Sequence, residues 1–98
     1  MTIYTVTYTY DENRADDRAG LLPEHRAWLT GKKDDGALIE AGVYTDSAMA
    51  LLLFRFDSIL TAERELDADP FAVAGLITSR VLHAWKPGWG PVAALAEA

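Results

Sequence analysis

Two short segments, far apart in the chain, carry the residues best suited to acid–base chemistry. Pro23-Glu24-His25 supplies an imidazole, and Asp69-Pro70-Phe71 supplies a carboxylate. A carboxylate that meets an imidazole orients the ring, fixes its tautomer and raises its basicity, which is what a general base requires. His25 and Asp69 are therefore the candidate catalytic residues, and only the fold can bring them together.

Each segment also has a purely structural interpretation. Asp69 before Pro70 is typical of a helix start, with a carboxylate N-cap followed by proline at the first helical position. Pro23 likewise suits the first turn of a helix, which would place His25 in that turn, where the helix dipole disfavours imidazolium. In this interpretation Asp69 is only a cap and His25 is a packed ring. The residues alone leave both interpretations open.

Length and charge restrict the class of protein. The 98 residues predict one domain, residues 1–98, with residues 88–98 as a peripheral tail. The formal net charge of −6 predicts no nucleic-acid partner, because phosphate binding requires a cationic face. The longest apolar run, Ala48 to Phe54, is far too short to span a bilayer, so we expect no membrane partner.

Neither a metal nor a cofactor is expected. Two histidines and scattered carboxylates lack metal-ligand spacing, the chain has no cysteine, and no glycine-rich phosphate loop occurs. The absence of cysteine agrees with a reducing compartment, and the first residues contain no basic segment followed by a long apolar run. We therefore predict a cytoplasmic protein.

Hydrophobic periodicity and turn residues predict the elements that must position these side chains. The predicted strands are Thr2–Tyr10, Ala37–Tyr44, Ala48–Phe56 and Leu76–Trp85. The predicted helices run from about Leu22 to Lys33 and from Ile59 to about Asp67, with a short helical turn after Asp69. Asp11 to Gly20 is predicted to be a charged, solvated loop.

The order strand, helix, strand, strand, helix, strand predicts a ferredoxin-like α+β fold, βαββαβ, with a four-stranded antiparallel sheet and the helices on one face. The strand Ala48–Phe56 is apolar on both faces until Arg55, although helices can cover only one of them. We therefore expect a homodimer that covers the helix-free face. This topology can bring His25 and Asp69 to the same end of the sheet.

Several segments resemble the YciI-like (YCII-related) family over about residues 3 to 87. The segments that carry the resemblance are Pro23–Leu29, Asp35–Gly42, Asp69–Phe71 and Ala74–Leu76. The resemblance implies a dimer of the dimeric α+β barrel type and a His–Asp pair that maps to His25 and Asp69. A characterised branch of this family removes chloride from a chlorinated hydroxyhydroquinone. The sequence departs from the common pattern at Val43, where proline is frequent, and at Thr45-Asp46-Ser47, which lacks a frequent glycine.

Two classes of function follow as hypotheses. The first is a small cofactorless lyase, dehydrochlorinase or isomerase that acts on a small molecule, such as an aromatic or phenolic one, with His25 as acid or base and Asp69 as its orienting partner. The second is a non-catalytic small-molecule-binding or protein-interaction module of the same fold. A cofactorless monooxygenase of the related barrel type has no specific residue in its favour. The candidate substrate-binding residues are Tyr8, Trp28 and Phe71 as pocket walls and Arg18 as a contact for an anionic ligand. Arg14 is an alternative for that contact, and the neighbouring carboxylates would compete with the ligand for either arginine.

Overall fold

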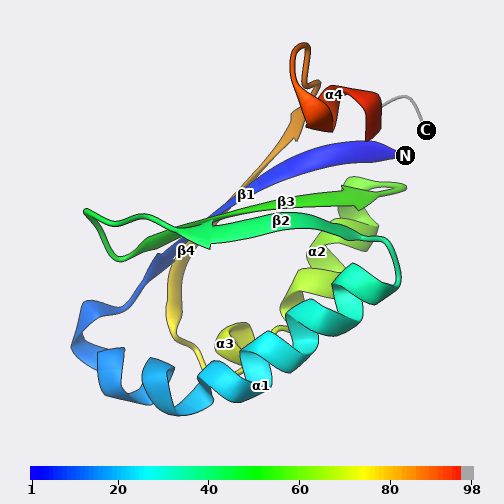
Figure 1. Ribbon diagram of the computed structural model, residues 1–98. Helices are drawn as coiled ribbons and strands as arrows, with labels where there is room; N and C mark the ends of the chain where they lie inside the picture. The colour runs from blue at the N-terminus through cyan, green and yellow to red at the C-terminus, as the bar shows by residue number, and fades with distance from the viewer. Residues whose placement is uncertain (96–98) are drawn as a thin grey trace.

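Four antiparallel strands form a single sheet in the order β2-β3-β1-β4 (Figure 1). The computed structural model describes residues 1–95. The strands are β1 (Thr2–Tyr10), β2 (Leu38–Val43), β3 (Met49–Phe56) and β4 (Ile77–Trp85). Strand β1 pairs with both β3 and β4, so the first and last strands of the chain are neighbours. This is the predicted ferredoxin-like βαββαβ arrangement, and the strand limits differ from the predicted ones by at most one residue.

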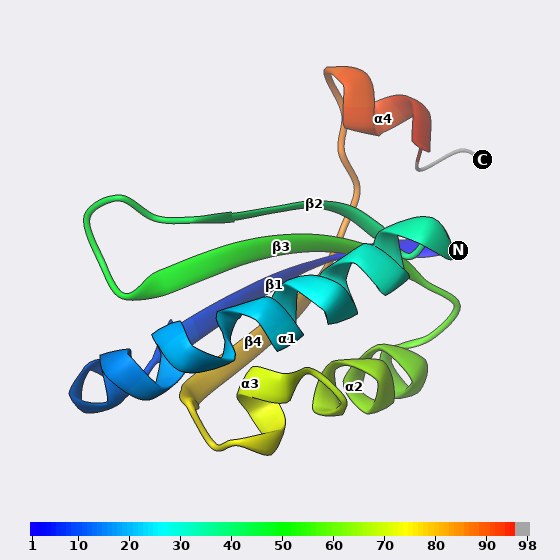
Figure 2. The same cartoon turned by 60° about the horizontal axis from the view of Figure 1, so that its bottom comes forward.

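Three helices cover one face of this sheet. They are α1 (Ala15–Asp34), which follows the short 3-10 turn η1 (Glu12–Arg14), α2 (Ile59–Asp67) and the single turn α3 (Pro70–Val73). Figures 1 and 2 show α1, α2 and α3 on the same side of the sheet, whereas α4 (Pro91–Leu95) lies on the opposite side. The predicted limits of α2 are confirmed, and Ser58 caps this helix by accepting the Thr61 N–H at 3.1 Å.

The start of α1 corrects a prediction. The segment predicted as a solvated loop is helical from Ala15, so Pro23 lies inside the helix and His25 is well beyond its first turn. Two acidic residues, Asp16 and Asp17, occupy the first turn, where they stabilise the positive end of the helix dipole. Pro23 is solvent-exposed, so water can replace the backbone hydrogen bond that proline removes. His25 is therefore too far from the positive end of the helix dipole to be affected by it, in contrast to the prediction.

The core lies between the sheet and the three helices. Alternation along β1 directs Tyr4, Val6, Tyr8 and Tyr10 into it. From β3 and the two later helices come Leu52, Phe54, Leu66 and Phe71. Because this core fixes the backbone of β1 and α3 against α1, it also positions the polar groups that lie among these apolar side chains.

The opposite face of the sheet is largely uncovered. Leu51, Val81 and Trp85 are exposed there. The helix α4 packs over one end of this face, where the Arg55 guanidinium donates a 3.4 Å hydrogen bond to the Leu95 carbonyl. None of the helices in residues 1–95 is long and apolar enough to cross a membrane.

Candidate functional site

The imidazole of His25 and the carboxylate of Asp69 meet in the interior. Their Nδ1 and Oδ1 atoms are 2.8 Å apart, and the two residues are 7% and 0% exposed. Helix α1 supplies the histidine, and the residue immediately before α3 supplies the aspartate. The prediction that these two side chains lie within hydrogen-bond distance is confirmed.

Asp69 accepts two further hydrogen bonds. The Tyr8 hydroxyl donates to Oδ2 at 2.9 Å, and the Phe71 backbone N–H donates to Oδ1 at 3.0 Å. The second bond is the N-cap of α3, so the capping role and the contact with His25 coexist in one carboxylate. An ionised carboxylate only accepts hydrogen bonds, and this arrangement gives it one donor from each of three segments.

These contacts assign the roles of the two imidazole nitrogens. Because a carboxylate oxygen of Asp69 accepts the hydrogen bond from Nδ1 of His25, the neutral His25 ring carries its proton on Nδ1 and its lone pair on Nε2. Among residues 1–95, no side chain or backbone group forms a hydrogen bond with Nε2. This nitrogen can therefore take a proton from a bound molecule or return one to it.

Aromatic rings hold the imidazole in place. The Phe71 ring stacks on His25 with centroids 4.0 Å apart and planes 10° apart. On α1 itself, the Trp28 ring lies 6.3 Å from the same imidazole. The ring plane is thus fixed by packing as well as by Asp69, which is the preorganisation that proton transfer in a defined direction requires.

Two tyrosine hydroxyls near Asp69 remain protonated at neutral pH. Burial, together with the negative charge of Asp69, raises the pKa of Tyr8 far above its ordinary value of 10.0. For the same two reasons the pKa of Tyr10 rises to about 12, although Arg18 opposes the shift. Tyr8 therefore stays neutral at neutral pH and donates a hydrogen bond to Asp69, without placing a second negative charge beside it.

His25 lines two neighbouring cavities between α1 and the β2–β3 hairpin. The first has a volume of about 310 Å³ and the second about 270 Å³. Both are lined by Tyr10, Leu22, His25 and Val43. Arg18, Tyr44, Met49 and Phe71 line only the first, and Arg26, Leu29, Ala41 and Leu52 line only the second. The volumes are at the lower end of the range for small-molecule sites.

The predicted substrate-binding residues fall into two groups. Arg18 and Phe71 line the first cavity together with His25. Tyr8 and Trp28 line neither cavity: Tyr8 is fully buried against Asp69, and Trp28 packs on Phe54 with ring centroids 5.9 Å apart. The position of Tyr8 makes it a positioning residue for Asp69. In the part of the chain that is described, no group of three or more His, Asp or Glu side chains is placed to hold a metal ion.

Tyr10 is one of the cavity residues that sequence reasoning did not single out. It follows Tyr8 on the same face of β1 and lies beneath the guanidinium of Arg18, which is 4.4 Å from the ring centroid. The alternation of tyrosines on this strand was a usable signal. It could not indicate which ring reaches the cavity, because that depends on how far α1 extends along the sheet.

Comparisons with solved structures agree on the fold. The chain is similar to 5-chloro-2-hydroxyhydroquinone dehydrochlorinase from Burkholderia phenoliruptrix AC1100, solved in complex with 2,5-dihydroxybenzoquinone. The TM-score is 0.78 at 19% identity, over 88% of this chain and 95% of that one. It is also similar to a NIPSNAP domain protein from Burkholderia xenovorans, with a TM-score of 0.55 at 13% identity, over 90% and 95% of the two chains. No curated protein matches the sequence.

The similarity to these structures extends over most of each chain, and it agrees with a fold of the dimeric α+β barrel type. The family comparison is more specific than the structural one. The model of the YCII-related domain matches residues 2–86, which include all four strands and both partners of the His25–Asp69 pair. The chain therefore belongs to the YCII-related domain family.

Proposed function

We propose that this protein is a small enzyme that transfers protons on a ring-shaped small molecule, as a lyase, dehydrochlorinase or isomerase that needs no cofactor. His25 acts as the acid or base through Nε2, and Asp69 orients the ring and stabilises its protonated form. The observation that carries the proposal is the 2.8 Å contact between Nδ1 and a carboxylate that is fully buried, beside a cavity that the same imidazole lines.

An elimination at this site is balanced without a further reagent. Nε2 of His25 removes a proton from the substrate, the freed electron pair forms a double bond, and the leaving group departs with its bonding electrons, as chloride does in a dehydrochlorination. Asp69 meanwhile accepts the Nδ1 hydrogen bond, so it stabilises the imidazolium that forms without taking its proton. An isomerisation uses the same groups, with His25 returning the proton to another atom.

The comparisons support a ligand of this kind. The dehydrochlorinase that resembles this chain was solved with a quinone, a flat six-membered ring, and its fold is shared over most of both chains. A ring of that size is compatible with the cavity of about 310 Å³ beside His25. The stacked ring of Phe71 provides an apolar wall for it.

Activity on chlorinated hydroquinones, hydroxyquinones and unsaturated lactones tests the proposal. We expect chloride release or a change in the ultraviolet spectrum with at least one of these substrates. His25→Gln should reduce the rate by about 10²- to 10⁴-fold, the usual contribution of a general acid or base. His83→Gln is the matched control, because His83 is exposed on the opposite face of the sheet. Binding of the compounds without turnover would instead favour a non-catalytic binding module.

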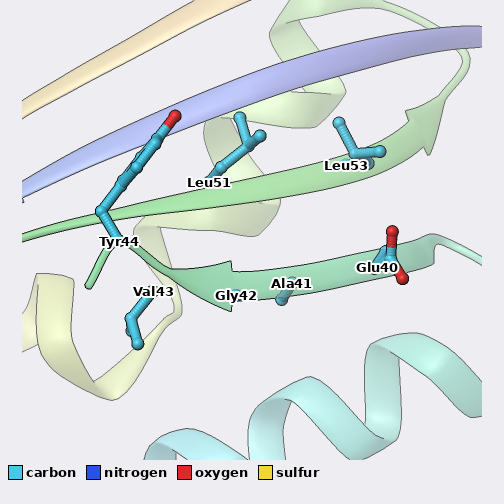
Figure 3. A pocket seen from close by; sticks show the side chains of 7 residues that line it. All are labelled: Glu40, Ala41, Gly42, Val43, Tyr44, Leu51 and Leu53. Atoms are coloured by element: carbon cyan, nitrogen blue, oxygen red, sulfur yellow. The ribbon is translucent and has the colours of Figure 1, made fainter. Parts of the chain in front are cut away.

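A homodimer is the second part of the proposal. On the helix-free face, Tyr44, Leu51 and Leu53 point away from α1 and line an apolar groove of about 380 Å³ (Figure 3). A second copy would remove these side chains from water. Light scattering should give twice the monomer mass of 10.8 kDa. Leu51→Glu should yield monomers, whereas Leu60→Glu, which alters an exposed leucine of α2, should not. A wild-type monomer at micromolar concentration would contradict the homodimer.

The cytoplasmic location of the protein stays a prediction.

A further inference from the structure

We propose that Arg18 recognises an anionic oxygen of the molecule bound beside His25, so that the ligand is a phenolate, an enolate or a carboxylate. The inference rests on the proposed function for the identity of the pocket. It adds the sign of the ligand's charge, which neither the His25–Asp69 pair nor the apolar wall of Phe71 indicates.

The guanidinium of Arg18 has an unused hydrogen-bond donor. Its Nη1 atom is buried and, within residues 1–95, has no hydrogen-bond partner. A buried donor without a partner is costly, and for a charged group the cost is greater than for a neutral one. Native proteins therefore leave few such groups, and each one calls for an explanation, such as a functional role or a bound water. The same side chain lines the cavity that contains His25.

The position of Arg18 on α1 suits a ligand held at two ends. Arg18 precedes His25 by about two helical turns, so both side chains lie on one face of the helix and their backbones are roughly 10 Å apart. Leu22 lies between them on that face and also lines the cavity. A six-membered ring with oxygen substituents can therefore contact the guanidinium at one end and Nε2 of His25 at the other.

Within residues 1–95, no charged side chain pairs with Arg18. None of the ion pairs among the described residues includes it, and Asp17, its neighbour in sequence, is paired with Arg14 at 3.0 Å. The ring that it covers, Tyr10, holds its proton up to about pH 12 and so supplies no negative charge at neutral pH. The guanidinium keeps its full charge for a ligand, in a chain whose net charge of −6 otherwise repels anions.

Arg14 shows what a structural arginine looks like in this protein. Its Nε donates to Asp17 at 3.0 Å, and its Nη1 donates to the Ala74 carbonyl, also at 3.0 Å. It thereby connects the start of α1 to the segment after α3. Arg14, the last residue of η1, precedes Arg18 of α1 by about one turn, and the two differ in that the donors of Arg14 are used within the protein.

An anionic oxygen at Arg18 also suits the proposed chemistry. When a base removes a proton from a carbon next to a carbonyl, or from a phenol hydroxyl, negative charge develops on the oxygen. A fixed guanidinium that faces this oxygen stabilises the charge as it develops. The Cζ atom of Arg18 lies 4.4 Å from the centroid of the Tyr10 ring. A guanidinium placed over an aromatic ring can still donate hydrogen bonds from its edge.

The test measures binding, without turnover, of two matched pairs of probes. The anions are 2,5-dihydroxybenzoquinone and 2,5-dihydroxybenzoate, and the neutral partners are the dimethyl ether of the first and the methyl ester of the second. By titration calorimetry, we expect the wild type to bind at least one anion ten-fold or more tightly than its neutral partner. Arg18→Gln should weaken the binding of that anion by about 10- to 100-fold, which is the effect of losing a hydrogen bond to a charged group. The affinity for the neutral partner should not change.

Arg14→Gln is the matched control and should leave the anion's affinity within about two-fold. If Arg18→Gln does not fold, Arg18→Met replaces it, because methionine can still pack on Tyr10 without charge or donors. Equal affinity of the wild type for anion and neutral partner in both pairs, or equal losses in the Arg14 and Arg18 variants, overturns the inference. Anion-selective binding without turnover would support the role of Arg18 and contradict the proposed enzymatic function. Turnover with an Arg18→Gln variant that binds the anion normally contradicts only the role of Arg18.

Discussion

Replacing Asp69 tests whether one carboxylate serves both the fold and the site. In Asp69→Ala, the Tyr8 hydroxyl, the Phe71 N–H and Nδ1 of His25 all lose their acceptor. Each is buried, and a buried donor without an acceptor costs about 1–3 kcal/mol, while loss of an N-cap costs about 1 kcal/mol. Two side-chain donors and the cap together give about 3–7 kcal/mol, against a total stability of about 5–15 kcal/mol for an ordinary domain.

Asp69→Asn should be much milder. Its amide oxygen can still accept from Phe71 N–H and from His25, and its NH₂ group can donate to the oxygen of Tyr8. What is lost is the extra strength of hydrogen bonds to a charged acceptor, which we expect to lower the free energy of unfolding by about 1–2 kcal/mol. Activity should fall further than stability in this variant, because an amide cannot stabilise a protonated His25 as a carboxylate does.

Urea denaturation followed by far-UV circular dichroism measures these differences from the unfolding midpoints, provided that the m-value is unchanged. Asp67→Ala is the control, because Asp67 is an exposed carboxylate nearby that pairs with Arg80 at 2.8 Å. A surface pair of this kind contributes about 0–1 kcal/mol. If Asp69→Ala costs no more than Asp67→Ala, or if the Ala and Asn variants unfold at the same midpoint, the dual role argued for Asp69 is wrong.

Three further predictions concern stability. Because burial raises the pKa of Tyr10 from 10.0 to about 12, the unfolded chain releases that proton first, so the contribution of Tyr10 to stability should be complete below pH 10 and fall by about 1.4 kcal/mol per pH unit between pH 10 and about pH 12; Tyr10→Phe should show a shallower decline in denaturation curves over that range. Gly75 has φ of 71°, so Gly75→Ala should cost about 1–2 kcal/mol in the same assay, and a neutral effect would contradict the strain argument. Lys32 of α1 pairs with Glu65 of α2 near the surface, so Glu65→Gln should cost only about 0.2–1 kcal/mol and less at high salt, which thermal melts in 0.05 and 1 M NaCl would resolve.

Local patterns in the sequence were sufficient for the sheet and for most of the helix limits. Side chains that alternate along β1 define its buried face, and the N-cap residues Ser58 and Asp69 indicate where α2 and α3 begin. These features depend on residues within one or two turns of each other, so a pattern can reveal them. The same reasoning misplaced the start of α1, because a proline inside a helix is tolerated where the neighbouring backbone faces water, and exposure is a tertiary property.

The candidate site depended on the tertiary structure. The sequence supplied His25 and Asp69 as chemically suitable partners, but their 2.8 Å contact requires α1 to cross the start of α3 at one position along the sheet. The hydrogen bond from Tyr8, the cavity beside His25 and the unpaired nitrogen of Arg18 arise from the same crossing. Contacts between segments distant in the chain are set by topology and core packing together, whereas residue type determines only which chemistry is possible once they meet.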